Sequence, residues 1–254
     1  MSTPARSEAW RLATFNIQYA AADRWLRKRE ALVAELHQLE ADVLCLQEVS
    51  AEGLAWLRST MGNPPCFAAG REDGLSAGEH VPVMVLNPDW SPIADGTFWF
   101  SPSPHCPSVG WGAAHPRICT WVKLARPELP ELTVFNVHLD HRSRRARLES
   151  GKLLQGFIES KVGGGLAVVC GDFNERRPER AMAPFPQRLY DVAVRAGAND
   201  PTWLGWSRLG LGRARIDYIL ADHRLELSNY ELGGAAKIAG NLSDHRPAIA
   251  DLIG

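Results

Sequence analysis

Short apolar runs and longer stretches of helical periodicity alternate along much of the chain. The runs are rich in Val, Leu and Ile, and several contain no polar position, which is typical of strands buried on both faces. The predicted strands cover residues 11–17, 42–46, 81–86, 96–100, 118–124, 132–139, 166–170, 216–220 and 247–252. Apolar residues repeat every three or four positions from Trp25 to Leu36, around Leu54 and Leu57, and over 144–162, which predicts a helix in each segment.

Pro and Gly interrupt this pattern between residues 64 and 123, where short apolar segments predict antiparallel strands joined by loops. No repeat, low-complexity segment or linker divides the chain. Strands and helices of this kind form layers around one core. We therefore predict an α/β (α+β) fold with one domain over residues 1–254, in which two sheets form a β-sandwich flanked by helices.

The composition fits an ordinary globular protein. The 254 residues are 45% hydrophobic and 22% charged, and a chain of this length buries a large core. No apolar run approaches the roughly 18 residues of a spanning helix, and the polar start contains no leader, so we expect a cytoplasmic protein without a membrane segment. Five cysteines without a CxxC pair predict reduced, mostly buried thiols.

The charge balance bears on the substrate. Lys and Arg number 28 against 29 Asp and Glu, which gives a formal net charge of -1. Proteins that follow long nucleic acids usually carry a basic surplus, so this balance disfavours a processive nuclease. Basic residues nevertheless cluster at 141–147, 176–180 and 208–215, where they form either a solvated face or a local surface for phosphate.

Polar side chains that can bind metal recur at the ends of the predicted strands. They are Asn16, Glu48, His138, Asp172, Asn174, Asp217, Asp244 and His245. Any one of them alone is usually a turn residue or a helix cap. Together they predict one pocket, because strand ends gather distant residues into a site. The set is rich in oxygen ligands and has no Cys/His cluster, which favours Mg²⁺ or Mn²⁺ and a phosphate ester as partner.

Six motifs in fixed order carry a family resemblance. They are TFNI (14–17), LQEV (46–49), FNVHLDH (135–141), GDFN (171–174), RIDYIL (215–220) and SDHRP (243–247). This series resembles the endonuclease/exonuclease/phosphatase superfamily, a group of deoxyribonuclease-like metal-dependent phosphoesterases. The middle of the chain is similar to a bacterial branch of that superfamily with unassigned substrate. The resemblance implies a deoxyribonuclease-like sandwich and metal-dependent hydrolysis of a P–O bond.

The resemblance also implies metal and water positions. Glu48 would be the principal metal ligand, with Asn16 beside it and Asp244 on the opposite side. Asp172 would orient or deprotonate the attacking water, and Asn174 would hold that water or a phosphate oxygen. Carboxylates suit these tasks, because they bind hard cations and accept protons.

The remaining implied roles concern the phosphate. His245 would contact the scissile phosphate, and Asp217 would orient its ring and stabilise its charge. His138 would form a second such pair with Glu79, and Arg117 would bind the phosphate. For Glu79 and Arg117 a purely structural role is the alternative, because both lie in the least regular part of the sequence.

Several further residues have open roles: Asp140, His141, Arg142, Arg147, Trp203 and Trp206. Arg147 lies near the apolar side of its predicted helix, which favours a structural role. The two tryptophans either stack on a base, line an apolar pocket or cover the core.

The sequence therefore predicts a phosphoric ester hydrolase that attacks in line with an activated water. The loop after Tyr19 is short and no insertion is suited to a DNA groove, which favours a small or terminal phosphorylated substrate. No protein partner is indicated. The alternatives are an exonuclease or endonuclease acting on DNA or RNA ends or damaged sites, and a catalytically silent binding module.

Overall fold

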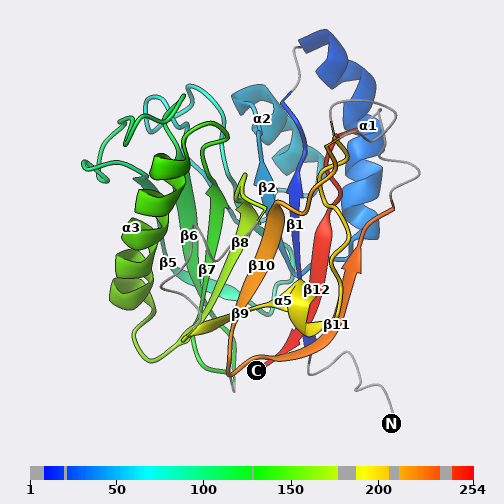
Figure 1. Ribbon diagram of the computed structural model, residues 1–254. Coiled ribbons are helices and arrows are strands. Elements are labelled where there is room, and N and C mark those ends of the chain that lie inside the picture. Colours follow the sequence, from blue (N-terminus) through cyan, green and yellow to red (C-terminus); the bar gives the residue numbers. More distant parts are fainter. Residues whose placement is uncertain (1–8, 20–21, 128, 177–186, 206–211, 235–241) are drawn as a thin grey trace.

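Two mixed sheets pack face to face in the computed structural model, and helices cover their outer sides (Figure 1). The structure describes residues 9–19, 22–127, 129–176, 187–205, 212–234 and 242–254. The first sheet has the strand order β11-β12-β1-β2-β4-β3, and the second has the order β5-β6-β7-β8-β10-β9. This arrangement confirms the predicted α/β sandwich flanked by helices.

The elements have the following bounds. The first sheet contains β1 (Ala9–Asn16), β2 (Val43–Gln47), β3 (Cys66–Phe67), β4 (Val83–Val85), β11 (Glu226–Leu232) and β12 (Ala248–Ile253). The second contains β5 (Ser91–Trp99), β6 (Ile118–Ala125), β7 (Leu132–His138), β8 (Leu166–Asp172), β9 (Leu189–Asp191) and β10 (Asp217–Asp222). The helices are α1 (Ala22–Gln38), α2 (Ala51–Thr60), α3 (Arg144–Val162) and α5 (Val192–Arg195).

Each sheet contains a parallel pair of strands that end at the same edge. In the first sheet β1 runs parallel to β2, with Asn16 opposite Gln47. In the second sheet β7 runs parallel to β8, with His138 opposite Asp172. The antiparallel strand β10 begins at this edge, with Asp217 opposite Asp172. The register therefore carries distant polar residues to one end of the sandwich.

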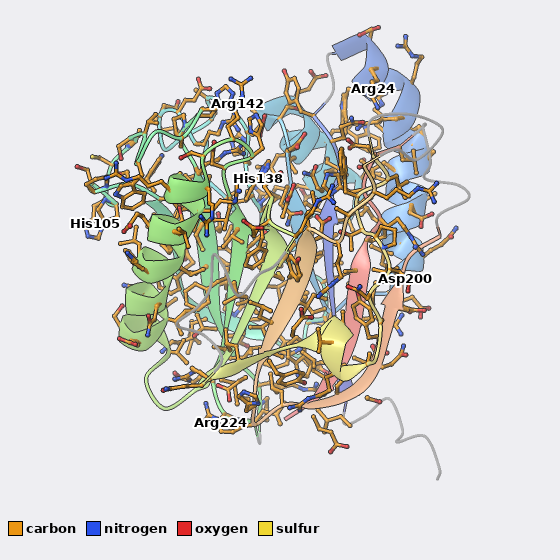
Figure 2. The ribbon with its side chains drawn as sticks, in the orientation of Figure 1. Arg24, His105, His138, Arg142, Asp200 and Arg224 are labelled. Atoms are coloured by element: carbon orange, nitrogen blue, oxygen red, sulfur yellow. The ribbon has the colours of Figure 1, made fainter. Side chains whose placement is uncertain are left out.

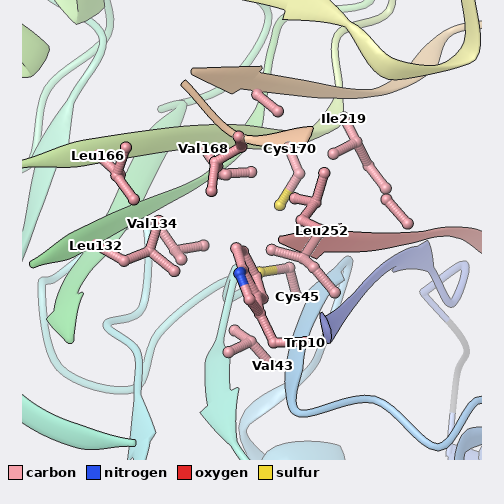
Figure 3. Close-up of a cluster of buried hydrophobic side chains, with 14 of the residues drawn as sticks. Trp10, Val43, Cys45, Leu132, Val134, Leu166, Val168, Cys170, Ile219 and Leu252 are labelled. Carbon is pink, nitrogen blue, oxygen red and sulfur yellow. The ribbon is translucent and has the colours of Figure 1, made fainter. Parts of the chain in front are cut away.

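The core between the sheets is apolar. Trp10, Val43 and Cys45 of the first sheet face Val134 and Val168 of the second (Figure 3). The amide pair Gln47 and Asn136 forms a buried hydrogen bond of 2.7 Å that joins the sheets near this same edge. Side chains of α3 and α1 pack on the outer sheet faces in two further clusters.

The sequence missed β3, β9 and β11. The first two are very short, and β11 lies at a sheet edge with exposed polar residues along it, so it shows no buried apolar run. The cysteines are free and three of them are buried: Cys45, Cys119 and Cys170. None of the helices in the described segments is long and apolar enough to span a membrane.

Candidate active site

A cavity of about 480 Å³ opens where the parallel strands end. Its wall contains these residues singled out from the sequence: Glu48, Glu79, Arg117, His138, Asp172, Asn174, Asp244 and His245. Asn16 and Asp217 lie behind the wall, each hydrogen-bonded to a lining residue. Figure 2 shows His138 at the upper ends of the strands, near the middle of the molecule. The structure thus brings every predicted site residue to one place.

Two carboxylates share the amide of Asn16. Its Nδ2 donates to Glu48 Oε1 at 2.9 Å and to Asp172 Oδ2 at 3.0 Å. The backbone N–H of Tyr19 donates to the second oxygen of Glu48, and that of Asn174 donates to Asp172 Oδ1. Burial, together with the nearby charge of Asp217, raises the pKa of Asp172 to about 7. Asp172 can therefore exchange a proton near neutral pH.

Glu48 and Asn174 both have left-handed backbone conformations, with φ of 60° and 48°. Such conformations are costly for residues other than glycine and concentrate at functional sites. At Asn174 the side-chain Nδ2 also donates to the carbonyl of Leu139, at 3.0 Å. Both residues are thus fixed by their own backbone and by neighbouring segments.

His245 and Asp217 form a direct pair. His245 Nδ1 lies 2.8 Å from Asp217 Oδ2, on the ring side that faces away from the cavity acids, so the predicted hydrogen bond is confirmed. Nε2 faces Asp172 and Asp244, at 3.9 and 4.0 Å. Burial alone lowers the pKa of His245, but the charge and hydrogen bond of Asp217, with Asp172 and Asp244, raise it to about 10. The ring is a buried cation.

His138 has a different environment. Its Nδ1 lies 3.9 Å from Glu79 Oε2, too far for a hydrogen bond, so the expected pair with Glu79 is not hydrogen-bonded, and its Nε2 lies 3.6 Å from Asp172. Arg71 donates to the same Glu79 oxygen at 2.6 Å. Burial and the charges of Arg117 and Arg71 lower the pKa of His138 well below its usual range, so this ring is neutral.

Arg71 is a cavity residue that the sequence analysis missed. It lies in an irregular loop, and nothing in the local pattern of that loop distinguishes a buried arginine from a solvated one. Only its contact with Glu79, which was a candidate residue, could have drawn attention to it.

Arg117 lies at the cavity wall and is 5% exposed. Its Nη2 is 2.9 Å from His141 Nδ1, and its Nε is 3.6 Å from Asp140 Oδ2. Asp140 also accepts from the backbone N–H groups of Ala114, Arg142 and Ser143, so it holds the loops around these residues in place. The basic cluster after Leu139 was expected to surround one phosphate, but among its described residues only His141 lines the cavity.

The other residues with open roles divide between the cavity and the scaffold. Trp203 lines the cavity, and its indole N–H donates to Asp244 Oδ2 at 3.1 Å. Arg147 donates to the carbonyl of Asp140 and to the carboxylate of Glu175, which is the structural role expected for it. Arg142 is exposed (Figure 2). Trp206 lies outside the described residues.

The donor groups suit a hard divalent cation. Donor atoms of Glu48, His138 and Asp172 lie within 4.8 Å of one another, as do those of Asp172, Asp217 and His245. The second group contains the His245 cation, whose nitrogens are both donors, and so fits a metal poorly. The carboxylate oxygens of the first group fit Mg²⁺ or Mn²⁺, whereas the imidazole of His138 is a ligand type that these hard cations use less. The Asn16 oxygen accepts from the Gln18 N–H, while its nitrogen faces the carboxylates.

A family model described as the endonuclease/exonuclease/phosphatase family matches residues 13–245. The chain belongs to this family. The predicted family and enzyme class, a phosphoester hydrolase, are thereby confirmed, and the family depends on divalent metal ions. A search of curated proteins finds no match to this sequence.

Solved structures of the family share the fold over their full length. A Bacteroides vulgatus endonuclease/exonuclease/phosphatase is 28% identical, with a TM-score of 0.88 over 96% of this chain and 98% of that one. A mannosyl-6-phosphatase from Bacteroides thetaiotaomicron is 22% identical, with a TM-score of 0.81 over 96% and 100%. TDP2 from D. rerio, complexed with a single-strand DNA product, is 16% identical, with a TM-score of 0.80 over 97% and 99%. The last two likenesses concern the fold alone.

Proposed function

We propose that this family member uses Mg²⁺ or Mn²⁺ to hydrolyse a phosphoester bond in a small or terminal phosphorylated substrate. The observation that carries the proposal is the buried Asp172, which contacts Asn16 and lies within 4 Å of His138 and His245 in one cavity. The cavity volume of about 480 Å³ is in the range of small-molecule sites. The free thiols suit a reducing compartment, so we place the enzyme in the cytoplasm.

The residues divide the reaction between them. Asp172 accepts a proton from the attacking water, whose oxygen forms a bond to phosphorus while the bond to the leaving oxygen breaks; the leaving oxygen keeps the electron pair of that bond and takes a proton from solvent to depart as an alcohol. Asn174 holds that water or a phosphate oxygen. The His245 cation donates from Nε2 to the phosphate, with Asp217 fixing its ring.

The remaining groups bind and neutralise the phosphate. Arg117 supplies positive charge, and the neutral His138 lies beside it as a donor or acceptor. Glu48 and Asp244 would hold the metal, and Asn16, whose oxygen accepts from the Gln18 N–H, would orient Glu48 beside it through its amide nitrogen. A bound divalent cation would offset the charge that develops on the phosphoryl oxygens.

Removal of the metal ligand tests this proposal. Glu48→Gln keeps the shape of the side chain but removes its charge, so kcat/KM on an activated phosphoester should fall by about 10³-fold or more. Calorimetry with Mg²⁺ or Mn²⁺ should show weaker binding in the same variant. The matched control is Glu159→Gln on the exposed side of α3. Full activity in EDTA would reject the proposal.

A nuclease acting on nucleic-acid ends is the second candidate. It is supported by the fold shared with TDP2, whose structure holds a single-strand DNA product, and by the cationic Arg117 and Arg176 at the cavity. The fold shared with a mannosyl-6-phosphatase supports the small substrate instead. Cleavage of long DNA that falls by about 10³- to 10⁵-fold between 50 and 200 mM salt would favour the nuclease.

A further inference from the structure

A second hollow of about 510 Å³ adjoins the active-site cavity. It lies between the loop after β1, the beginning of α2 and the loop over residues 70–79. Arg71 and Glu79 line both hollows, so they form the wall that the two share. A molecule whose phosphate occupies the active-site cavity can therefore extend into this second hollow past these two side chains.

Arg71 brings a largely buried positive charge to this shared wall. The residue is 8% exposed, and its Nη1 donates to Glu79 Oε2 at 2.6 Å. Its Nε is buried and has no hydrogen-bond partner in the part of the chain that the structure describes. That atom is closed to solvent, so a ligand at this wall meets the guanidinium chiefly as a positive charge, which favours a ligand oxygen over an apolar group. The preferred ligand thus presents an oxygen where the two hollows meet.

The charge of the hollow excludes a second phosphate. The carboxylates of Glu52, Glu72 and Glu79 line it, against the single cation of Arg71. Like charges at close range repel, so a leaving group that carries its own phosphate is disfavoured there. Carboxylates are strong acceptors for hydroxyl groups, which makes the same lining favourable for a neutral polyol.

The lining of the hollow suits a sugar. Tyr19 lines it and is 52% exposed, so its ring offers an open apolar face with a polar tip. The hydroxyl groups of Ser50 and Ser76 line it as well. A pyranose presents apolar C–H groups on its faces and hydroxyl groups around its edge, which matches a lining of one aromatic ring and several acceptors.

We propose that this second hollow binds a neutral polyhydroxylated leaving group, such as a hexose, whose phosphate lies in the active-site cavity. The inference rests on the proposed phosphoester hydrolysis and names its substrate class. Arg71 contacts the sugar oxygen next to the phosphate, Glu52 and Glu72 accept from hydroxyl groups, and Tyr19 packs on the ring. Nucleoside diphosphates and triphosphates and bisphosphorylated sugars are disfavoured by the carboxylates, because each would bring a further phosphate into the hollow.

Two substrates that share the sugar and differ by one phosphate test the proposal, and the charge-removing variants below separate the effect of charge from that of size. Glucose 6-phosphate and glucose 1,6-bisphosphate share the sugar, and the second adds one phosphate at the far end. The wild type should prefer the monophosphate by about 10-fold or more in kcat/KM. The double variant Glu52→Gln/Glu72→Gln should reduce that preference at least 5-fold, because it removes the repulsion. Tyr19→Ala should raise KM for both sugars by about 3- to 10-fold.

The control is Glu159→Gln/Glu226→Gln, which removes the same charge from two exposed positions outside the hollow and should leave the preference unchanged. Calorimetry with the non-hydrolysable 6-methylenephosphonates of both sugars gives a readout independent of turnover. A wild type that binds them with the expected preference but cleaves no phosphoester contradicts the proposed function alone. The ratio of the monophosphate to the bisphosphate can be taken for kcat/KM and for Kd. If both ratios are the same in the wild type, the hollow variants and the control, the proposed sugar site is wrong.

Discussion

Two histidines that line the cavity and flank Asp172 are buried to a similar extent, yet one is charged and the other neutral. His245 is 5% exposed and His138 is 6% exposed, and both lie within 4 Å of Asp172. The pKa of His245 is raised to about 10, whereas that of His138 is lowered well below its usual range. Burial is therefore not what distinguishes them.

The difference lies in the carboxylate behind each ring. Asp217 Oδ2 lies 2.8 Å from His245 Nδ1, and Asp217 Oδ1 has no hydrogen-bond partner among the described residues, so no arginine or lysine there draws this carboxylate away from the imidazole. Glu79 lies 3.9 Å from His138 and bonds Arg71 instead. His245 is thus a cation because a carboxylate is hydrogen-bonded to its ring. His138 is neutral because its neighbouring carboxylate is bonded to an arginine, so that burial lowers the pKa of the ring. One cavity can then hold a cationic donor and a neutral imidazole together.

The largest expected effect compares the two rings directly. His245→Ala should lower kcat by about 10²- to 10⁴-fold, because it removes a positioned cation at the phosphate. The loss of kcat in His138→Ala should be about 10-fold smaller than that in His245→Ala, because the His138 ring carries no charge. Steady-state kinetics at pH 7 with saturating Mg²⁺ measures both. Equal losses in the two variants would contradict the division of roles.

The next effect is on stability, measured without metal in EDTA. The folded protein keeps the His245 proton up to about pH 10, and the unfolded chain loses it near the ordinary pKa of 6.5. The His245–Asp217 pair therefore makes its full contribution to the free energy of unfolding below pH 6.5. This contribution disappears as the pH rises to 10. Asp217→Asn should lower the free energy of unfolding by about 2 kcal/mol at pH 6 and much less at pH 10. Urea unfolding at both pH values measures this, and an equal loss at both would refute the pairing.

A smaller effect tests why His138 is neutral. Arg71→Met removes a cation that lowers the His138 pKa and releases Glu79 toward the ring. The pKa of His138 should rise, as followed by NMR titration of its ring protons, and kcat/KM should fall by about 10-fold, the usual worth of one charge-assisted contact. Arg71→Lys keeps the charge and serves as the control. An unchanged pKa in Arg71→Met would show that burial alone keeps the ring neutral.

The smallest effect concerns charge at the rim. Arg142 is exposed, and within the described residues its hydrogen bond to Asp140 comes from the backbone N–H, which alanine keeps, so Arg142→Ala should change kcat/KM less than 2-fold, as is usual for a surface substitution. Arg117→Ala, at the buried wall, should cost far more. A large loss for Arg142→Ala would indicate that the substrate extends past the rim, as nucleic acid would.

Much of the candidate site could be predicted because its residues follow strands with readable patterns. Asp172 ends an apolar strand, and Asp217 begins another, so their positions at one edge follow from strand pairing. Arg71 could not be found in this way. It lies in a loop of the Pro- and Gly-rich middle region, where no periodicity indicates which side chains are buried. The exposed edge strand β11 escaped prediction for a related reason, because its polar residues hide the strand pattern.

The sequence by itself determined the main strands and helices, the family motifs and the polar residues at the strand ends, because these depend on local periodicity and residue chemistry. Only the tertiary structure decided which carboxylate touches which histidine, and therefore which ring is charged. It also placed Arg71 in the wall shared by the active-site cavity and the second hollow. Distances between segments far apart in the chain, and the burial that shifts a pKa, arise only when the sheets and loops pack together.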